Sequence, residues 1–166
     1  RELREKMRVL RDHGMSKERR YYHEVVGFNY RMTNLQAAIG TAQAERIEDI
    51  LIWRDELETQ YRKVFSGIPG VTLQRRDLPD RKKISWLVSV LVSQDKRDQA
   101  LSALKEQGID ARAFFVPLSE MNIYKSYARP CTVSKKIAGM GVNLPTTYEI
   151  KMEEIEKIAS VLKQVL

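Results

Sequence analysis

Asn29 and Arg31 are the residues whose types and spacing best suit a defined chemistry. They stand two positions apart in a stretch that alternates polar and bulky residues, so an extended backbone would point both side chains to one side. Thr33 and Gln36 follow with the spacing of a capping box, which predicts that a helix begins directly afterwards. A guanidinium and a carboxamide beside a helix N-terminus suit a phosphate, and we therefore predict an anion site here.

Other reactive residue types give weaker indications. His13 and His23 are the only histidines and have no cysteine or carboxylate cluster at metal-ligand spacing, so we expect no metal site. Cys131 is the single cysteine and cannot form an internal disulfide, which favours a reducing compartment. The lysines, Lys135 and Lys136 among them, are typical of solvated helix surfaces. The sequence contains no nucleophile triad, zinc pattern or dinucleotide fingerprint.

The elements that must position these residues begin with helices. Apolar residues recur at helical spacing in residues 1–12, and a longer apolar stripe runs from residue 34 to about residue 65 without a proline. Residues 15–26 combine charges and aromatic rings without a clear period, so we expect an ordered loop there. Two helices flanking an ordered loop are thus predicted for residues 1–66, the first of two expected domains.

Residues 67–166 are predicted to form a second domain with alternating strands and helices. Gly67 and Pro69 cannot continue a helix at low cost and mark the boundary. The expected strands are 71–73, 84–92, 109–115 and 142–144, and the expected helices are one between Ser93-Gln94-Asp95 and Gly108, one over 132–140 and one over 152–165. The predicted fold is therefore α/β, a long helix followed by a small C-terminal α/β sandwich domain.

Composition restricts the possible partners. The chain has 166 residues, of which 43% are hydrophobic, and its longest apolar run is far below the ~20 residues that span a bilayer. The net charge of +7 could attract nucleic acid, but the basic residues are mixed with 22 acidic ones and no recognition motif accompanies them. A basic surface that attracts an anionic substrate explains the charge better. We expect a cytoplasmic protein without a membrane or nucleic-acid partner.

Five motifs in a fixed order carry a resemblance to a known family. They are Arg11-Asp12-His13-Gly14, the stretch from Gly27 to Gly40, Gly108-Ile109-Asp110-Ala111-Arg112, Phe114-Phe115-Val116-Pro117-Leu118 and Gly141-Val142-Asn143-Leu144-Pro145. Together they resemble the DegT/DnrJ family of pyridoxal-phosphate-dependent nucleotide-sugar aminotransferases, and most closely its members acting on GDP- or dTDP-linked 4-keto-6-deoxy sugars. The resemblance extends over the whole chain.

The resemblance implies a fold-type I aminotransferase whose N-terminal catalytic part, with the cofactor-binding lysine, lies upstream of this chain. On that basis the chain would be inactive alone, and the parent protein would form the 4-amino sugar, as in perosamine synthesis, with glutamate as the expected donor. Asn29 and Arg31 would bind the phosphate of pyridoxal 5'-phosphate (PLP) in the neighbouring subunit of a homodimer. His13, Phe115 and Ser119 would contact the substrate, although the family usually has histidine where Ser119 stands.

Alternative interpretations stay open at this stage. The chain could be a non-catalytic regulatory or assembly domain of the same family, or a basic nucleic-acid-binding module. Asn29 and Arg31 could be ordinary surface residues, with Arg31 in a salt bridge. His13 could make a single structural hydrogen bond, and Phe115 could belong to the hydrophobic core.

Overall fold

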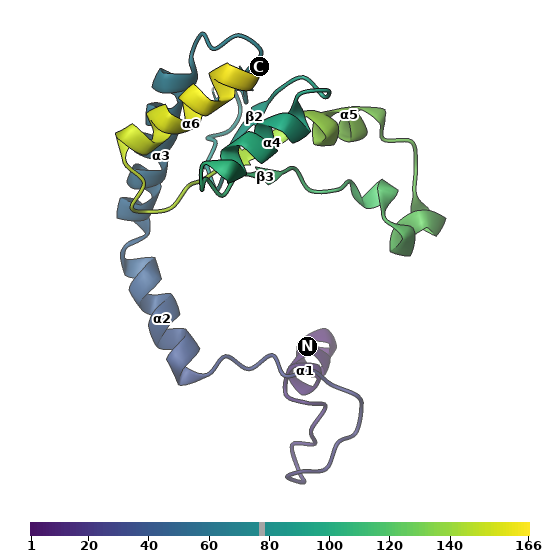
Figure 1. Cartoon of the computed structure of the whole chain (residues 1–166). Coiled ribbons are helices and arrows are strands. Elements are labelled where there is room, and N and C mark those ends of the chain that lie inside the picture. Colours follow the sequence, from purple (N-terminus) through teal and green to yellow (C-terminus); the bar gives the residue numbers. More distant parts are fainter. Residues whose placement is uncertain (77–78) are drawn as a thin grey trace. The chain divides into compact units, whose positions relative to one another are not determined.

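Two compact units make up the chain in the computed structural model, which describes residues 1–76 and 79–166. The first unit comprises Arg1–Glu48 and the second Asp49–Leu166 (Figure 1). The division falls near the start of helix α3 (Ile47–Phe65). The domain boundary expected between residues 66 and 67 remains a prediction about the whole protein.

In the first unit, an extended segment that contains residues 28–31 folds back on the end of helix α1 (Glu2–Arg11). The amide of Phe28 donates to the carbonyl of Leu10 at 2.7 Å, and the amide of Tyr30 donates to the carbonyl of Arg11 at 3.0 Å. The helix predicted over residues 1–12 is confirmed. Residues 15–26 form neither a helix nor a regular strand, as predicted for an ordered loop.

Two glycines allow this segment to approach the chain that leaves α1. A Cβ atom added to Gly14 would lie 1.9 Å from the carbonyl oxygen of Val25, and one added to Gly27 would lie 2.0 Å from the amide nitrogen of Gly14. Gly14 also has a φ of 69°, in the left-handed region that favours glycine. Any side chain at these two positions would therefore force the backbones apart.

The capping box predicted at Thr33 is confirmed. The amide of Gln36 donates to Thr33 Oγ1 at 3.3 Å, and the amide of Thr33 donates to Gln36 Oε1 at 2.9 Å. Helix α2 (Asn34–Glu45) follows, but the long helix expected up to residue 65 is interrupted at Arg46. There φ is −107° and ψ is 11°, and the Arg46 amide donates to a carbonyl three residues back, which tightens the last turn of α2.

The second unit is a four-stranded antiparallel sheet with helices, so the predicted α/β fold is confirmed. The strands are in the spatial order β1-β2-β4-β3. After α3 the elements are β1 (Thr72–Leu73), β2 (Val88–Leu91), α4 (Arg97–Glu106), β3 (Arg112–Ala113), the 3-10 helices η1 (Leu118–Glu120) and η2 (Asn122–Tyr127), α5 (Thr132–Met140), β4 (Gly141–Leu144) and α6 (Met152–Val165).

One face of this sheet carries the hydrophobic core. Val88 and Val90 of β2 pair with Leu144 and Val142 of β4, and all four side chains are buried. Helices α4 and α6 pack against each other and contribute further buried residues (Figure 1). The helical part of the core consists of Leu57, Tyr61, Phe65, Ala100, Leu104, Ile155, Ile158, Ala159 and Leu162. Because successive side chains along a strand point to opposite faces of the sheet, the residues between these buried ones face the other way.

Two strands are shorter than predicted. The strand expected over residues 84–92 is regular only in β2, and the one expected over 109–115 only in β3. Ile109 and Ala111 are engaged locally, because their amides donate to the carbonyls of Leu104 and Ile109 as the chain leaves α4. Hydrogen bonds of the turn thus replace strand pairing there.

Helix α4 lies between Ser93-Gln94-Asp95 and Gly108, as predicted. Its N-cap is Lys96, and no side chain caps it, although Ser93, Gln94 and Asp95 include residue types that commonly begin helices. The backbone carbonyl of Ser93 instead accepts from the amides of Lys96 and Arg97, both at 3.1 Å.

A buried carboxylate, Glu58 on α3, ties the helix to the segment of residues 83–85. Its Oε1 atom accepts from Arg62 Nη2 at 2.7 Å and from Lys83 Nζ at 2.8 Å, and its Oε2 atom accepts from the hydroxyl of Ser85. Burial by itself would raise the pKa of Glu58, but the hydrogen bonds from Lys83, Ser85 and Arg62 outweigh it and lower this pKa to about 2. Glu58 is thus charged and fully paired in the folded chain.

We expect Gly27→Ala to disrupt the first unit locally, because the new methyl group would meet the backbone of Gly14. Hydrogen exchange should show lost protection of the Phe28 and Tyr30 amides. Gly40→Ala is the matched control, since no described atom beyond its own stretch of helix lies within 4 Å of the added Cβ and alanine favours a helix by about 1 kcal/mol over glycine. Unchanged amide protection in Gly27→Ala would contradict the close-approach argument.

We expect Glu58→Gln to destabilise the second unit at neutral pH, because breaking a buried ion pair costs about 3–5 kcal/mol. The Glu58 pKa is about 2 in the folded chain, whereas a glutamate in an unfolded chain titrates near ~4.3. The stabilisation is therefore complete above that unfolded value and is lost as the pH falls towards 2.

Denaturant unfolding at a series of pH values tests this expectation. The difference in unfolding free energy between the wild type and Glu58→Gln should shrink in acid, which isolates Glu58 from the other carboxylates. Glu56→Gln, an exposed change of the same kind on the same helix, should show no such difference. A difference that stays constant with pH would contradict the role given to the Glu58 charge.

Candidate functional site

The predicted anion-binding residues lie on the segment that folds back on α1. Asn29 forms an isolated antiparallel bridge with Asp12, and Asp12 Oδ2 accepts from Arg31 Nη1 at 3.2 Å. Asn29 and Arg31 are exposed, and 65% of the Arg31 side chain is accessible. Because a guanidinium has five N–H donors, the contact with Asp12 leaves most of them available to an anion.

His13 lies next to these residues in the first unit. Its backbone has a positive φ of 61°, and its amide donates to the Phe28 carbonyl at 3.0 Å. The carbonyl of His13 lies 2.8 Å from Nδ1 of His23, so that ring fixes the His13 backbone. His13 is exposed and follows Asp12, the residue that forms a bridge with Asn29 and accepts a hydrogen bond from Arg31.

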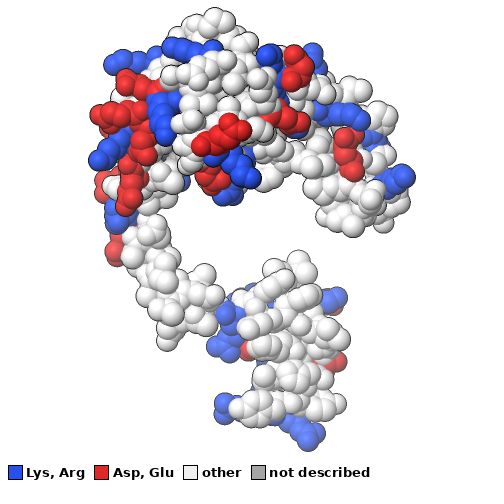
Figure 2. Space-filling view, in the orientation of Figure 1, with Lys and Arg blue, Asp and Glu red and all other residues white. Residues whose placement is uncertain are grey.

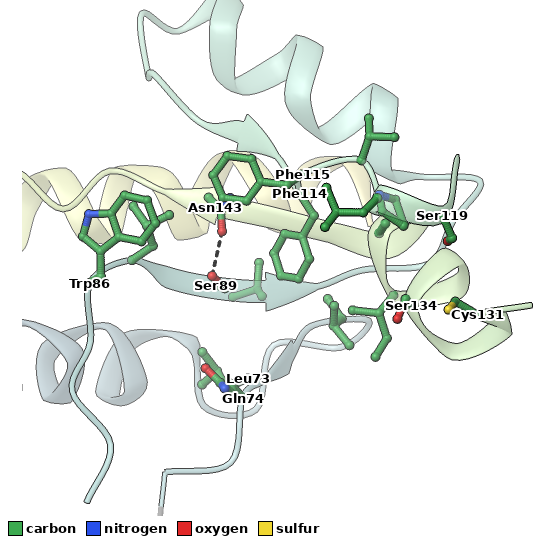
Figure 3. A pocket seen from close by; sticks show the side chains of 18 of the residues that line it. Leu73, Gln74, Trp86, Ser89, Phe114, Phe115, Ser119, Cys131, Ser134 and Asn143 are labelled. Carbon is green, nitrogen blue, oxygen red and sulfur yellow. Dashed lines mark hydrogen bonds between the residues drawn. The ribbon is translucent and has the colours of Figure 1, made fainter. Parts of the chain in front are cut away.

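A pocket of about 1220 Å³ lies in the second unit, over the sheet face opposite the core. Phe115 and Ser119, the other two predicted substrate residues, both line it. Trp86 lies at one end of the pocket, and Ser119 and Cys131 lie at the other (Figure 3). The volume exceeds the about 300–1,000 Å³ that is common for small-molecule sites, so a large ligand has room here.

The floor of the pocket is built by the strand residues that alternate with the core valines. Ser89 donates its hydroxyl hydrogen to Asn143 Oδ1 at 2.7 Å, across β2 and β4 (Figure 3). Asn143 is buried in the sheet yet lines the pocket. This pair supplies hydrogen-bonding groups in an otherwise mostly apolar pocket, an arrangement that can orient a ligand.

Aromatic rings form the walls of the pocket. The rings of Trp86 and Phe115 lie nearly parallel, at 12°, with centroids 6.4 Å apart. Phe114 covers Gly141, where an added Cβ would lie 2.1 Å from the ring. Phe115 is 71% exposed, so the interpretation of this residue as core is wrong, and its ring is free to contact a ligand.

Sequence reasoning missed several residues of this pocket. Trp86 falls within the strand expected over residues 84–92, but it precedes β2 and is 67% exposed. Asn143 belonged to a recognised motif, but no role was predicted for it. The signal that could have identified Ser89 and Asn143 is their polar type at alternate positions within valine-rich strands.

Other kinds of site find little support in the described chain. No group of three His, Cys, Asp or Glu side chains within residues 1–76 and 79–166 could hold a metal ion. None of the described helices combines the length and apolar character of a membrane crossing. Lys and Arg are interspersed with Asp and Glu over the second unit, without a continuous basic patch on the face shown (Figure 2).

Comparison with known proteins agrees with the motifs. Residues 1–163 match the DegT/DnrJ/EryC1/StrS aminotransferase family. A GDP-perosamine synthase from Caulobacter vibrioides is 36% identical over 172 aligned positions, which cover 99% of this chain and 46% of that protein. A GDP-perosamine synthase from Vibrio cholerae is 30% identical over 93% of this chain and 43% of that protein.

Solved structures show the same fold. PseC from Helicobacter pylori, an aminotransferase involved in pseudoaminic acid biosynthesis, has a TM-score of 0.82 at 24% identity, over 99% of this chain and 46% of PseC. DesV from S. venezuelae, solved in complex with a ketimine intermediate, has a TM-score of 0.79 at 26% identity, over 98% of this chain and 44% of DesV.

The chain thus spans less than half the length of these relatives. Within that length the match is nearly complete and includes both the segment with Arg31 and the pocket with Phe115. This chain belongs to the DegT/DnrJ/EryC1/StrS aminotransferase family.

Proposed function

We propose that the whole protein transfers an amino group from an amino acid, with glutamate as the expected donor, to the 4-keto carbon of a nucleotide-linked 6-deoxy sugar. The product would be a perosamine-type 4-amino sugar for a surface polysaccharide. The observation that carries this proposal is the alignment with GDP-perosamine synthases along almost the whole chain. The proposal extends to the whole protein, because this chain aligns with less than half of those relatives.

PLP is the cofactor proposed for this reaction, and it supplies an electron sink when bound. The donors on the segment beside α1 fit its phosphate, since Arg31 offers charged N–H groups and Asn29 a carboxamide. Asp12 holds the guanidinium at 3.2 Å and would orient it towards the phosphate. The lysine that binds the cofactor and moves the proton is expected outside the 166 residues, as the resemblance implies.

The pocket of the second unit is the proposed site for part of the sugar nucleotide. Phe115 and Trp86 present aromatic surfaces that would pack against a ring and exclude water. Ser119 offers a hydroxyl to a sugar or phosphate oxygen, where the family usually offers an imidazole. His13 is proposed as a further substrate contact from the first unit.

A homodimer with shared active sites is the proposed assembly. No residue of α2 is buried in the described chain, and Leu35 and Ile39 are 72% and 59% exposed. The helix has no charged residue before Glu45, and it appears as an uncharged stretch in Figure 2. Exposed apolar surface of this kind supports packing against a second subunit or the rest of the protein.

We expect Arg31→Ala in the full-length protein to weaken PLP binding without unfolding the chain, because the side chain is mostly exposed. A charge-assisted contact contributes about 1.5–3 kcal/mol, which corresponds to roughly tenfold or more in affinity. Cofactor titration followed by absorbance would measure the change. Asp12→Ala is the matched control, since it removes the same ion pair but keeps the guanidinium and should reduce affinity less.

Mixed dimers test the sharing of sites. A subunit with Arg31→Ala and a subunit without the cofactor-binding lysine should together form one site with both lesions and one with neither. Partial recovery of amino transfer relative to each mutant homodimer is therefore expected. No recovery despite proven subunit exchange would indicate that Arg31 serves its own subunit or only the structure, and the cross-subunit role of Asn29 would lose its support.

A further inference from the structure

The buried carboxylate of Glu58 contacts residues of the pocket wall without lining the pocket itself. Glu58 is 4% exposed and does not line the pocket. Its partners Lys83 and Ser85 flank Ile84, and Trp86 comes next in the chain. Lys83, Ile84 and Trp86 all line the pocket, so the Glu58 carboxylate holds the side chains of the residues on both sides of a wall residue, Ile84.

Through Arg62, the same carboxylate also holds a second stretch of the pocket wall. Arg62 donates Nε and Nη2 to Glu58 Oε1 at 2.9 and 2.7 Å, which fixes the plane of the guanidinium. The Nη2 group also donates to the backbone carbonyl of Gln74, another pocket residue. Two stretches of the wall that are separate in sequence are therefore held, directly or through Arg62, by Glu58.

Packing alone does not fix the aromatic part of this wall. Trp86 is 67% exposed, and its ring has Phe115 as a neighbour on one side. The Trp86 carbonyl accepts from Arg54 Nη1 at 3.0 Å and from Thr146 Oγ1 at 3.3 Å, which anchors the chain after the indole. The chain on the N-terminal side of Trp86 is held through Ser85, whose hydroxyl donates to Glu58.

We infer that Glu58 is a positioning residue for the pocket, which through Lys83, Ser85 and Arg62 sets the place of Trp86 and the wall around it. A side chain at position 58 that turned to solvent would leave this part of the wall without the contacts that hold it. The role in substrate binding rests on the proposed function, whereas the position of Trp86 can be measured independently of it.

Fluorescence of Trp86 in the chain of residues 1–166 tests the inference. Trp53 is the other tryptophan, so a Trp53→Phe background leaves Trp86 as the only indole. Time-resolved anisotropy and iodide quenching would be compared for Glu58→Gln, Lys83→Met and Ser85→Ala. Glu56→Gln is the matched control, and Phe115→Leu is the positive control because it removes the neighbouring ring.

The expected result is faster nanosecond depolarisation and stronger quenching of Trp86 in Glu58→Gln, with smaller shifts in the same direction in Lys83→Met and Ser85→Ala. Glu56→Gln should match the background. Should Glu58→Gln fail to fold, Ser85→Ala decides, since it removes one hydrogen bond from the carboxylate and leaves its ion pairs. Unchanged anisotropy and quenching in the folded variants, with a clear response in Phe115→Leu, would overturn the inference.

Kinetics of the complete enzyme separate the inference from the proposed function. In the variants that displace Trp86, KM for the sugar nucleotide should rise more than kcat falls. The reason is that a wall of the binding pocket is altered while no reacting group is removed. A shift in Trp86 fluorescence without any change in KM would support the positioning role and contradict the assignment of this pocket to the substrate.

Discussion

The antiparallel pairing of β2 with β4 is the interaction on which the second unit depends. This register directs Val90 and Val142 into the core and Ser89 and Asn143 into the pocket. A slip of one residue would exchange the two sets and place polar groups against the helices. Stability and the candidate binding surface therefore follow from the same register, and the Ser89–Asn143 hydrogen bond reinforces it from the pocket side.

The first unit combines structure and candidate chemistry in a similar way. Gly14 and Gly27 permit a close approach of two backbones, and the amides of the following segment then bond to the end of α1. Asn29 and Arg31 are held on this segment while their side chains contribute little to packing. The backbone of this segment is held by hydrogen bonds and Arg31 is already paired with Asp12, so less conformational entropy is lost when an anion binds.

Local signals predicted much of the fold. The capping box at Thr33, the helix over residues 132–140 and the apolar stripe of α6 all appear where the sequence indicated them. The helix is interrupted at Arg46 although neither proline nor glycine stands there or next to it in the sequence. The strand around residues 109–115 is short because its first amides bond within the turn after α4, which alternation of residue types cannot reveal.

The candidate site was predicted only in part, for a related reason. Asn29, Arg31 and the loop with Phe115 were found through motifs that are contiguous in sequence. The contacts of Glu58 with Lys83 and Ser85 span 25 and 27 residues, and no local pattern connects them. Trp86 falls within the strand expected over residues 84–92, and only the pairing of the strands shows that the regular strand begins after it.

The proposed amino transfer can be measured with an isotope label in the full-length protein. The protein would be supplied with PLP, glutamate labelled with a heavy nitrogen isotope and a GDP-linked 4-keto-6-deoxy sugar, and the sugar nucleotide would be analysed by mass spectrometry. We expect a product that carries the labelled nitrogen on the sugar, together with 2-oxoglutarate. A folded protein that binds PLP but transfers no label to GDP- or dTDP-linked keto sugars would contradict it.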